Sequence, residues 1–213
     1  PGPPRSAHRT ASPAPPVDET SEVLFAELDK RGLVALFSEE SIEHSLGRLE
    51  VAARTGISLS ASNAEEALLR AACAHATTID EVRNRELDRL LHTVVDPAAV
   101  GTFEQRVPRA VELPSGRTLK VHYARGRGPW IESYLQDFFG MPETPRAGGE
   151  PVTVHLWAPN RRPVQVTTDL ASFWTQAYPE LKRSLSRRYP KHVWPDDPRR
   201  ADPTRLKRHL GKN

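Results

Sequence analysis

Residues 109–123 read RAVELPSGRTLKVHY, and the period of the apolar side chains changes within this stretch. Val111 and Leu113 alternate with polar residues ahead of the turn sequence PSG (114–116), and Leu119, Val121 and Tyr123 alternate after it. Alternation on both sides of a turn that contains proline and glycine predicts two antiparallel strands. We therefore expect a helical segment to end near residue 108 and a segment that contains a sheet to follow it.

The segment before residue 109 shows the three- and four-residue apolar spacing of helices. Its predicted caps accept hydrogen bonds from the free N–H groups of a first turn, and they are Ser21, Ser38, Asn63, Thr78 and Asp96. Gly32 and Gly56 are placed to end the first two helices. The residues expected to face the core of this small helical bundle are Val23, Leu24, Leu28, Ile42, Leu46, Leu49, Ala53, Leu68, Leu69, Ala72, Leu87, Leu90 and Leu91.

The segment after residue 124 mixes both periods. Pro129 is expected to open a helix with one apolar stripe, and alternation predicts strands at 152–157 and 164–166. Asp169 or Thr168 is expected to cap a further helix that breaks or kinks at Pro179. The expected apolar residues of these two helices are Ile131, Tyr134, Leu135, Phe138, Leu170, Phe173, Trp174 and Ala177. The predicted fold class is α+β, with a small helical bundle followed by a small antiparallel sheet packed on helices and an irregular basic C-terminal tail.

Four segments follow from these patterns. We expect a disordered Pro-rich linker at 1–17, a helical subdomain at 18–108, an α+β domain at 109–190 and a basic Pro-rich tail at 191–213. A linker that does not begin with Met suggests a larger protein upstream, and a trimmed pro-segment is the alternative. The single cysteine, Cys73, fits a reducing compartment, and no stretch is apolar enough for a membrane span. We therefore expect a cytoplasmic protein.

The charge of the chain is distributed unevenly. Residues 17–106 hold 9 Lys and Arg against 17 Asp and Glu, whereas residues 181–213 hold 11 against 3. An acidic front and a basic end therefore share one chain. The eight histidines offer no pair three or four residues apart, so the sequence predicts no metal site.

Six strings after residue 108 carry a resemblance to a known family. They are LPSGR (113–117), VHY (121–123), LQDFFG (135–140), LWAPNRRP (156–163), TDLASFW (168–174) and RYPKHVWP (188–195). In this order they resemble the C-terminal region of HrpB-type bacterial DExH-box ATP-dependent helicases. The resemblance implies a parent protein whose two upstream RecA-like motor domains bind ATP and Mg²⁺, hydrolyse ATP and act on nucleic acid, with RNA the expected substrate.

None of that machinery has a counterpart in this sequence. A Gly-rich loop ending in Gly-Lys-Ser/Thr is missing, and phosphate binding by such a motor requires one. The stretch DEVR (80–83) differs from the acidic motor motif at its last residue, and two acidic residues at a helix start simply favour the helix dipole. We therefore expect no catalytic site and no cofactor in this chain.

The basic end offers the best candidate for a binding surface. Guanidinium and ammonium groups neutralise phosphates, and an irregular tail can present a tryptophan for stacking. The candidate nucleic-acid-binding residues are Arg161, Arg162, Lys182, Arg183, Arg187, Arg188, Lys191 and Trp194. A solvated basic face is the alternative for the charges, and a ring that pins the tail to the domain is the alternative for Trp194.

Two functions follow. The first is a non-catalytic helicase extension whose basic surface contacts nucleic acid, expected to be single-stranded RNA or DNA bound without sequence preference, beside the motor domains of the parent. The second is a docking module that tethers the helicase to a partner protein. A free-standing hydrolase ranks last, because no nucleophile and base stand in a catalytic pattern.

Overall fold

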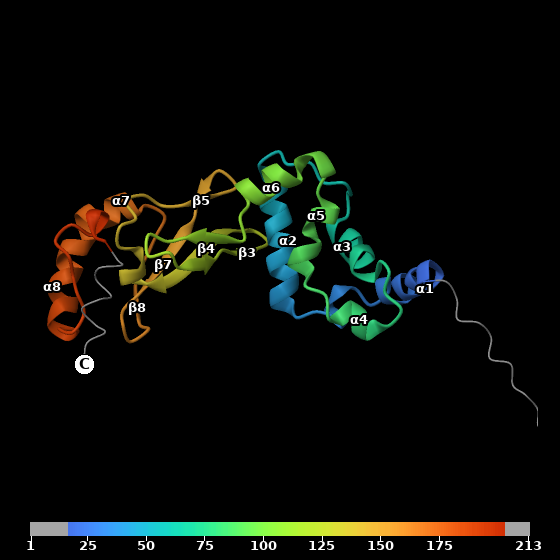
Figure 1. Cartoon of the computed structure of the whole chain (residues 1–213), viewed down its shortest axis with the longest axis horizontal. Helices are drawn as coiled ribbons and strands as arrows, with labels where there is room; N and C mark the ends of the chain where they lie inside the picture. Colours follow the sequence, from blue (N-terminus) through green and yellow to red (C-terminus); the bar gives the residue numbers. More distant parts are fainter. Residues whose placement is uncertain (1–16, 203–213) are drawn as a thin grey trace, which may run out of the picture.

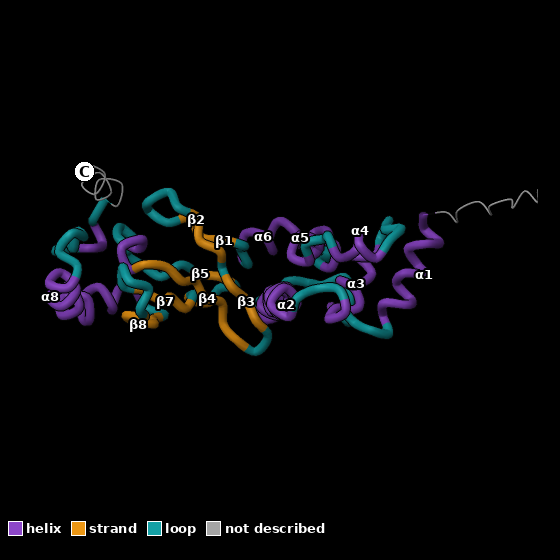
Figure 2. The backbone as a smooth tube through the Cα atoms, turned by 90° about the horizontal axis from the view of Figure 1, so that it is seen from below, coloured by secondary structure: helices purple, strands orange, loops and turns teal. Residues whose placement is uncertain are grey.

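The computed structural model describes residues 17–202, and Figure 1 shows them as an elongated molecule. Helices α1 to α6 gather at one end, the sheets lie in the middle, and α7 and α8 lie at the other end (Figures 1 and 2). The predicted linker, except Val17, and residues 203–213 of the predicted tail lie outside the described residues. Arg205, Lys207 and Arg208, which belong to the basic end, therefore have no described position.

Side-chain caps start several helices of the helical end. Ser38, Asn63, Thr78 and Asp96 accept hydrogen bonds from the backbone N–H groups of Ser41, Glu66, Glu81 and Ala98, as predicted. Gly32 and Gly56 follow the first two helices with positive φ angles of 69° and 79°. The helices are α1 Val17–Asp29, α2 Glu39–Arg54, α3 Ala64–Cys73, α4 Ile79–Arg83, α5 Leu87–Val94 and α6 Val100–Arg106.

Four predictions for this end are wrong. Ser21 lies inside α1, where it is buried and donates a hydrogen bond to the carbonyl of Ala76, so it is not a cap. The inward stripe of α1 passes through Phe25 and Leu28, and Val23 points to solvent. Ala53 is also exposed at the end of α2, and the helix predicted after Thr78 divides into α4 and α5.

A mixed four-stranded sheet in the order β3-β4-β7-β8 forms the middle of the molecule. The predicted strand pair around PSG is confirmed as the small antiparallel pair β1–β2, and the α+β class is confirmed. The sequence predicted an antiparallel sheet. The main sheet is instead mixed, because β4 and β7 run parallel. The strands are β1 Ala110–Glu112, β2 Thr118–Lys120, β3 His122–Ala124, β4 Arg127–Tyr134, β5 Arg146–Ala147, β6 Glu150–Pro151, β7 Thr153–Trp157 and β8 Pro163–Thr167.

The helix predicted from Pro129 is wrong. Residues Arg127–Tyr134 form β4, and only Leu135–Phe138 forms a single 3-10 turn. Pairing with β3 on one side and β7 on the other supplies the backbone partners that a strand needs. The apolar residues of this stretch fit either period, so distant partners decided its structure.

Two glycines make the junction between the helices and the sheets. A Cβ on Gly47 of α2 would lie 2.5 Å from backbone atoms of Ala124 in β3, so only glycine allows this approach. A Cβ on Gly148, in the turn between β5 and β6, would lie 2.3 Å from Val51 of α2. The Gly148 N–H also donates to the carbonyl of Arg106. The junction is therefore a close backbone contact.

The C-terminal helical segments follow one another without a gap. Asp169 caps α7 Leu170–Ser172 as predicted, and a π-helical segment, Phe173–Ala177, leads into α8 Tyr178–Arg188. Pro179 is accommodated in the first turn of α8, just after the wider π segment, which spares the chain a full break. Trp174 is buried, and its indole N–H donates to the carbonyl of Met141. Within residues 17–202, no helix is both long and apolar enough to cross a membrane.

Candidate nucleic-acid interface

Helix α8, at the end of the molecule farthest from α1 (Figure 1), holds four of the predicted basic residues, Lys182, Arg183, Arg187 and Arg188, and Lys191 follows it. Tyr178 and Leu185 anchor the helix in the core. Arg183 and Arg187, four residues apart, are both exposed. Because the buried face fixes the helix, its other side presents these cations at a fixed spacing along the backbone.

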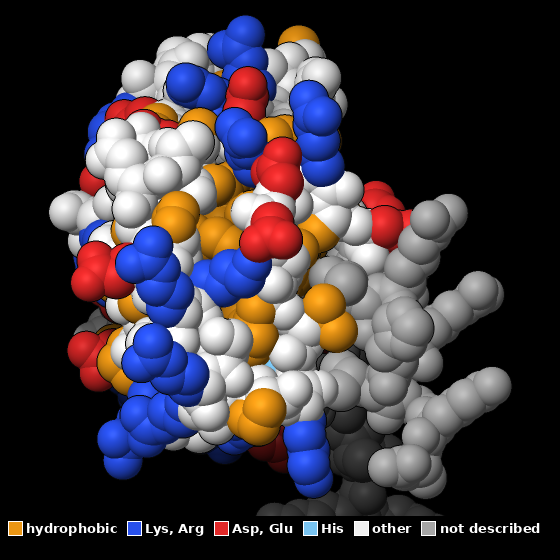
Figure 3. Space-filling view, turned by 90° about the vertical axis from the view of Figure 1, so that its left-hand side faces the viewer, with side chains coloured by type: hydrophobic (Ala, Val, Ile, Leu, Met, Phe, Trp, Pro, Cys, Tyr) orange, Lys and Arg blue, Asp and Glu red, His pale blue; other side chains and the backbone are white. Residues whose placement is uncertain are grey.

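In α8 and the segment that follows it, four of the predicted cations have no acidic partner in the described part of the chain: Arg183, Arg187, Arg188 and Lys191. Arg188 lies 5.8 Å from the centre of the Tyr189 ring. Lys182 differs, because it pairs with Asp196, and only a quarter of its side chain is exposed. Figure 3, which looks onto this end, shows Lys and Arg side chains around a seam of apolar side chains, with acidic side chains between them.

Trp194 lies in the core, with 9% of its surface exposed. Its ring packs against Phe139 at 6.4 Å, and its N–H donates to the carbonyl of Tyr189. The ring therefore pins the segment after α8 to the domain, which was the alternative given for it, and presents no open face for stacking.

Arg161 and Arg162 lie in the loop between β7 and β8 and are exposed. Arg161 has a positive φ of 64° and donates from Nε to the hydroxyl of Tyr134 in β4, 3.0 Å away. This contact joins Arg161 to the solvent face of the sheet, and no hydrogen bond or ion pair among residues 17–202 joins the loop to α8. The structure thus places the eight predicted residues in three regions: α8 with the segment after it, the core, and the loop between β7 and β8.

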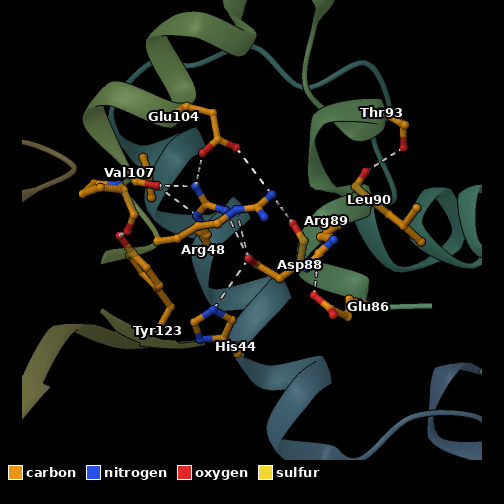
Figure 4. Close-up of polar contacts among 12 residues, drawn as sticks. His44, Arg48, Glu86, Asp88, Arg89, Leu90, Thr93, Glu104, Val107 and Tyr123 are labelled. Carbon is orange, nitrogen blue, oxygen red and sulfur yellow. Dashed lines mark hydrogen bonds and ion pairs between the residues drawn. The ribbon is translucent and has the colours of Figure 1, made fainter. Parts of the chain in front are cut away.

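A buried charge cluster in the helical end was not predicted (Figure 4). The side chain of Arg48 in α2 is fully buried. It donates to the carbonyl of Val107 at 2.6 and 2.9 Å, to Asp88 at 3.1 Å and to Glu104 at 3.0 Å. Its guanidinium lies 4.5 Å from the ring centre of Phe103. The cluster ties α2 to α5, α6 and the start of the β segment.

Charges around Asp88 fix its protonation state. Burial alone would raise the pKa of Asp88, but the hydrogen bond from His44 and the charges of Arg48 and Arg109 lower it to about 2. Burial also raises the pKa of the nearby Tyr123 phenol, which donates to the carbonyl of Pro108 at 2.7 Å. A carboxylate so firmly ionised serves poorly as a proton donor or acceptor at neutral pH, so the cluster is suited to holding the fold together.

Two further kinds of candidate site in the described chain are a metal centre and a charged groove. No three His, Cys, Asp or Glu side chains of residues 17–202 gather closely enough to hold a metal ion. A groove of about 560 Å³ beside α2 mixes Arg83, Arg85 and Lys120 with Glu40, Glu86 and Asp88, so its charges balance. This groove therefore offers a ligand no surplus of positive charge.

Comparison with known proteins defines the class. Residues 68–198 match the sequence model of the family described as "ATP-dependent helicase C-terminal", HrpB_C, and the chain belongs to this family. The resemblance found in the sequence is thereby confirmed.

Particular relatives share both sequence and fold. The chain is 33% identical over 136 residues, which are 62% of its length, to the ATP-dependent RNA helicase HrpB of Escherichia coli (strain K12). It matches the crystal structure of the E. coli DExH-box NTPase HrpB with a TM-score of 0.74 and 28% identity over 91% of the chain. A second structure, of the E. coli DEAH/RHA helicase HrpB, matches over 88% with a TM-score of 0.62 and 24% identity, which shows the fold alone. The chain spans 17% of the curated relative and 25% of the first solved chain.

Proposed function

We propose that this chain is a non-catalytic accessory part of a cytoplasmic ATP-dependent RNA helicase and that it contacts nucleic acid through the basic surface of α8. ATP and Mg²⁺ act in the motor domains of the parent protein, which are also the partners of this chain. The observation that carries the proposal is a set of four exposed cations in and just after α8, none of which meets an acidic residue within residues 17–202: Arg183, Arg187, Arg188 and Lys191.

These cations suit a ligand without sequence preference. Contacts to phosphates release counterions and give affinity to any sequence, with dissociation constants on the order of micromolar or weaker at physiological salt. A single strand is the expected ligand, because binding without sequence preference needs only a positively charged surface that follows the backbone.

The test measures binding of a fluorescein-labelled 12-mer of uridines by anisotropy at two salt concentrations. Changing the four cations to Gln should weaken binding and reduce the salt slope by ~0.7 for each lost phosphate contact. The matched control changes Lys30, Arg54, Arg83 and Arg89 to Gln, which removes the same charge from the helical end. It should have much less effect.

Two results would contradict the proposal. Equal weakening by both sets would mean that only net charge matters, and no binding of the wild type at low salt would leave α8 a solvated face. In the second case the apolar seam in Figure 3 favours the alternative, docking of a partner protein.

A further inference from the structure

The main sheet has one face in the core and one face toward solvent. Along β4 and β7 the buried residues alternate with half-buried ones, which is the pattern of a sheet with one open face. Residues opposite each other across neighbouring strands share a face, and the register pairs His122 with Trp130, Glu132 with His155, and Tyr134 with Trp157. The open face therefore carries five rings: His122, Trp130, Tyr134, His155 and Trp157.

The first group of rings surrounds Trp130. His122 stacks on Trp130 with ring centres 5.2 Å apart and planes inclined by 17°. The guanidinium of Arg127 lies 4.0 Å from the centre of the Trp130 ring and 3.5 Å from Nε2 of His155. Planar groups thus already stack on this tryptophan, and Arg127, which is exposed, can exchange the ring for a phosphate.

The second group lies farther along β4. Tyr134 and Trp157 meet edge to face with ring centres 6.2 Å apart, and Arg161 donates to the Tyr134 hydroxyl. Arg161 holds this position with a left-handed backbone, which is uncommon for arginine. Trp130 and Tyr134 are four residues apart, or about 13 Å along a strand. About four nucleotides of a stacked single strand cover that distance.

Charge and ring type identify the occupant. Arg127 and Arg161 flank the rings, Arg162 follows in the same loop, and Glu132 is the one acidic residue on the open face of β4 and β7. In the four strands of this sheet, the only strongly exposed large aliphatic side chain is Val166 of β8. Rings with cations beside them match bases joined by phosphates, whereas a docked protein helix would favour an aliphatic surface.

We propose that the open face of the β3-β4-β7-β8 sheet stacks the unpaired bases of a single-stranded nucleic acid, with Trp130 and Trp157 as the principal stacking rings. The choice of ligand rests on the proposed function, but the surface is a different one and it contacts bases. Single-stranded RNA bound on this face is held by stacking, with Arg127 and Arg161 at its phosphates.

The experiment compares two labelled 12-mers, oligouridine and the same ribose-phosphate strand without bases, which carry equal charge. Wild-type protein should bind the intact strand at least about fivefold more tightly, as expected from the loss of one stacked base. The variant Trp130→Val/Trp157→Val, which keeps strand-forming residues, should lose that preference and bind the abasic strand as the wild type does. Trp157→Phe should retain most of the preference, which guards against a merely structural effect.

The α8 variant separates this inference from the proposed function. Changing Arg183, Arg187, Arg188 and Lys191 to Gln should weaken binding of both strands and leave their ratio unchanged. Equal affinity of the wild type for both strands overturns the stacking face while the phosphate-binding α8 surface stands. A preserved ratio in the double Val variant also overturns it, and binding of neither strand overturns both proposals.

Discussion

The two ends of this molecule use arginine in opposite ways. In the acidic helical end, Arg48 is buried and bonded to Asp88, Glu104 and a backbone carbonyl. In the basic end, Arg183 and Arg187 are exposed and meet no acidic residue of the described chain. The difference teaches that the local balance of charges decides the role of a cation. Surplus acids can neutralise an arginine in the core, whereas surplus cations stay at the surface.

The largest expected effect comes from replacing the buried arginine of this comparison, Arg48. Arg48→Met keeps much of the volume but leaves Asp88, Glu104 and the Val107 carbonyl short of a partner. We expect a loss of about 3–5 kcal/mol in the free energy of unfolding, measured by denaturant titration. The matched control, Arg187→Met, should be indistinguishable from the wild type. A small effect of Arg48→Met would mean that the cluster is not a structural contact.

The next effect tests how firmly the basic end is attached. Trp194→Ala removes a buried ring that packs on Phe139 and should cost about 3 kcal/mol, close to the cost of Trp174→Ala. From the sequence alone, a tail tryptophan would be expected to cost much less. Denaturant unfolding of the two variants compares them directly, and a negligible loss for Trp194→Ala would show that the segment after α8 is only loosely attached.

The sequence predicted most helix caps but not the pairing of strands that lie far apart along the chain. The caps at Ser38, Asn63, Thr78, Asp96 and Asp169 depend on residues within three positions, and all are confirmed. The helix expected after Pro129 is a strand because β3 and β7 pair with it, and β7 begins only at Thr153. Sequence spacing carries no information about a parallel partner more than twenty residues away.

The candidate site was predictable in part. Positive charge after residue 180 pointed to α8, but the pairing of Lys182 with Asp196 and the burial of Trp194 depend on how the tail folds back. The rings of the open sheet face were missed because Tyr134 was assigned to a helix core. Arg48 was missed because arginine in a helix usually faces solvent. Arg48 lies four residues after His44, and Val51 and Ala52 continue the same buried face of α2. This spacing was the signal in the sequence that could have indicated its burial.

A smaller effect tests the junction between the two ends. Gly47→Ala places a methyl group 2.5 Å from the backbone of Ala124, and a backbone cannot move aside cheaply. We expect a loss of about 2–3 kcal/mol and a shifted contact between α2 and β3. The matched control is Gly101→Ala in α6, where nothing lies within 4 Å. There the same change should raise the stability by about 0.5–1 kcal/mol, so a common sign for both variants would exclude the close contact.

The smallest effect concerns pH and returns to the buried cluster. The pKa of Asp88 is about 2 in the folded chain and 3.8 in a free side chain. As pH falls from about 4 to 2, the unfolded chain therefore takes up a proton at Asp88 before the folded chain does, and this group's stabilisation is lost over that window. The shift corresponds to about 2 kcal/mol. Thermal unfolding followed from pH 5 to pH 2 should show this loss in the wild type, and Asp88→Asn, although less stable at every pH, should show a correspondingly shallower decline. An equally steep decline in both proteins would mean that other carboxylates cause the acid sensitivity and that ionised Asp88 does not stabilise the folded chain.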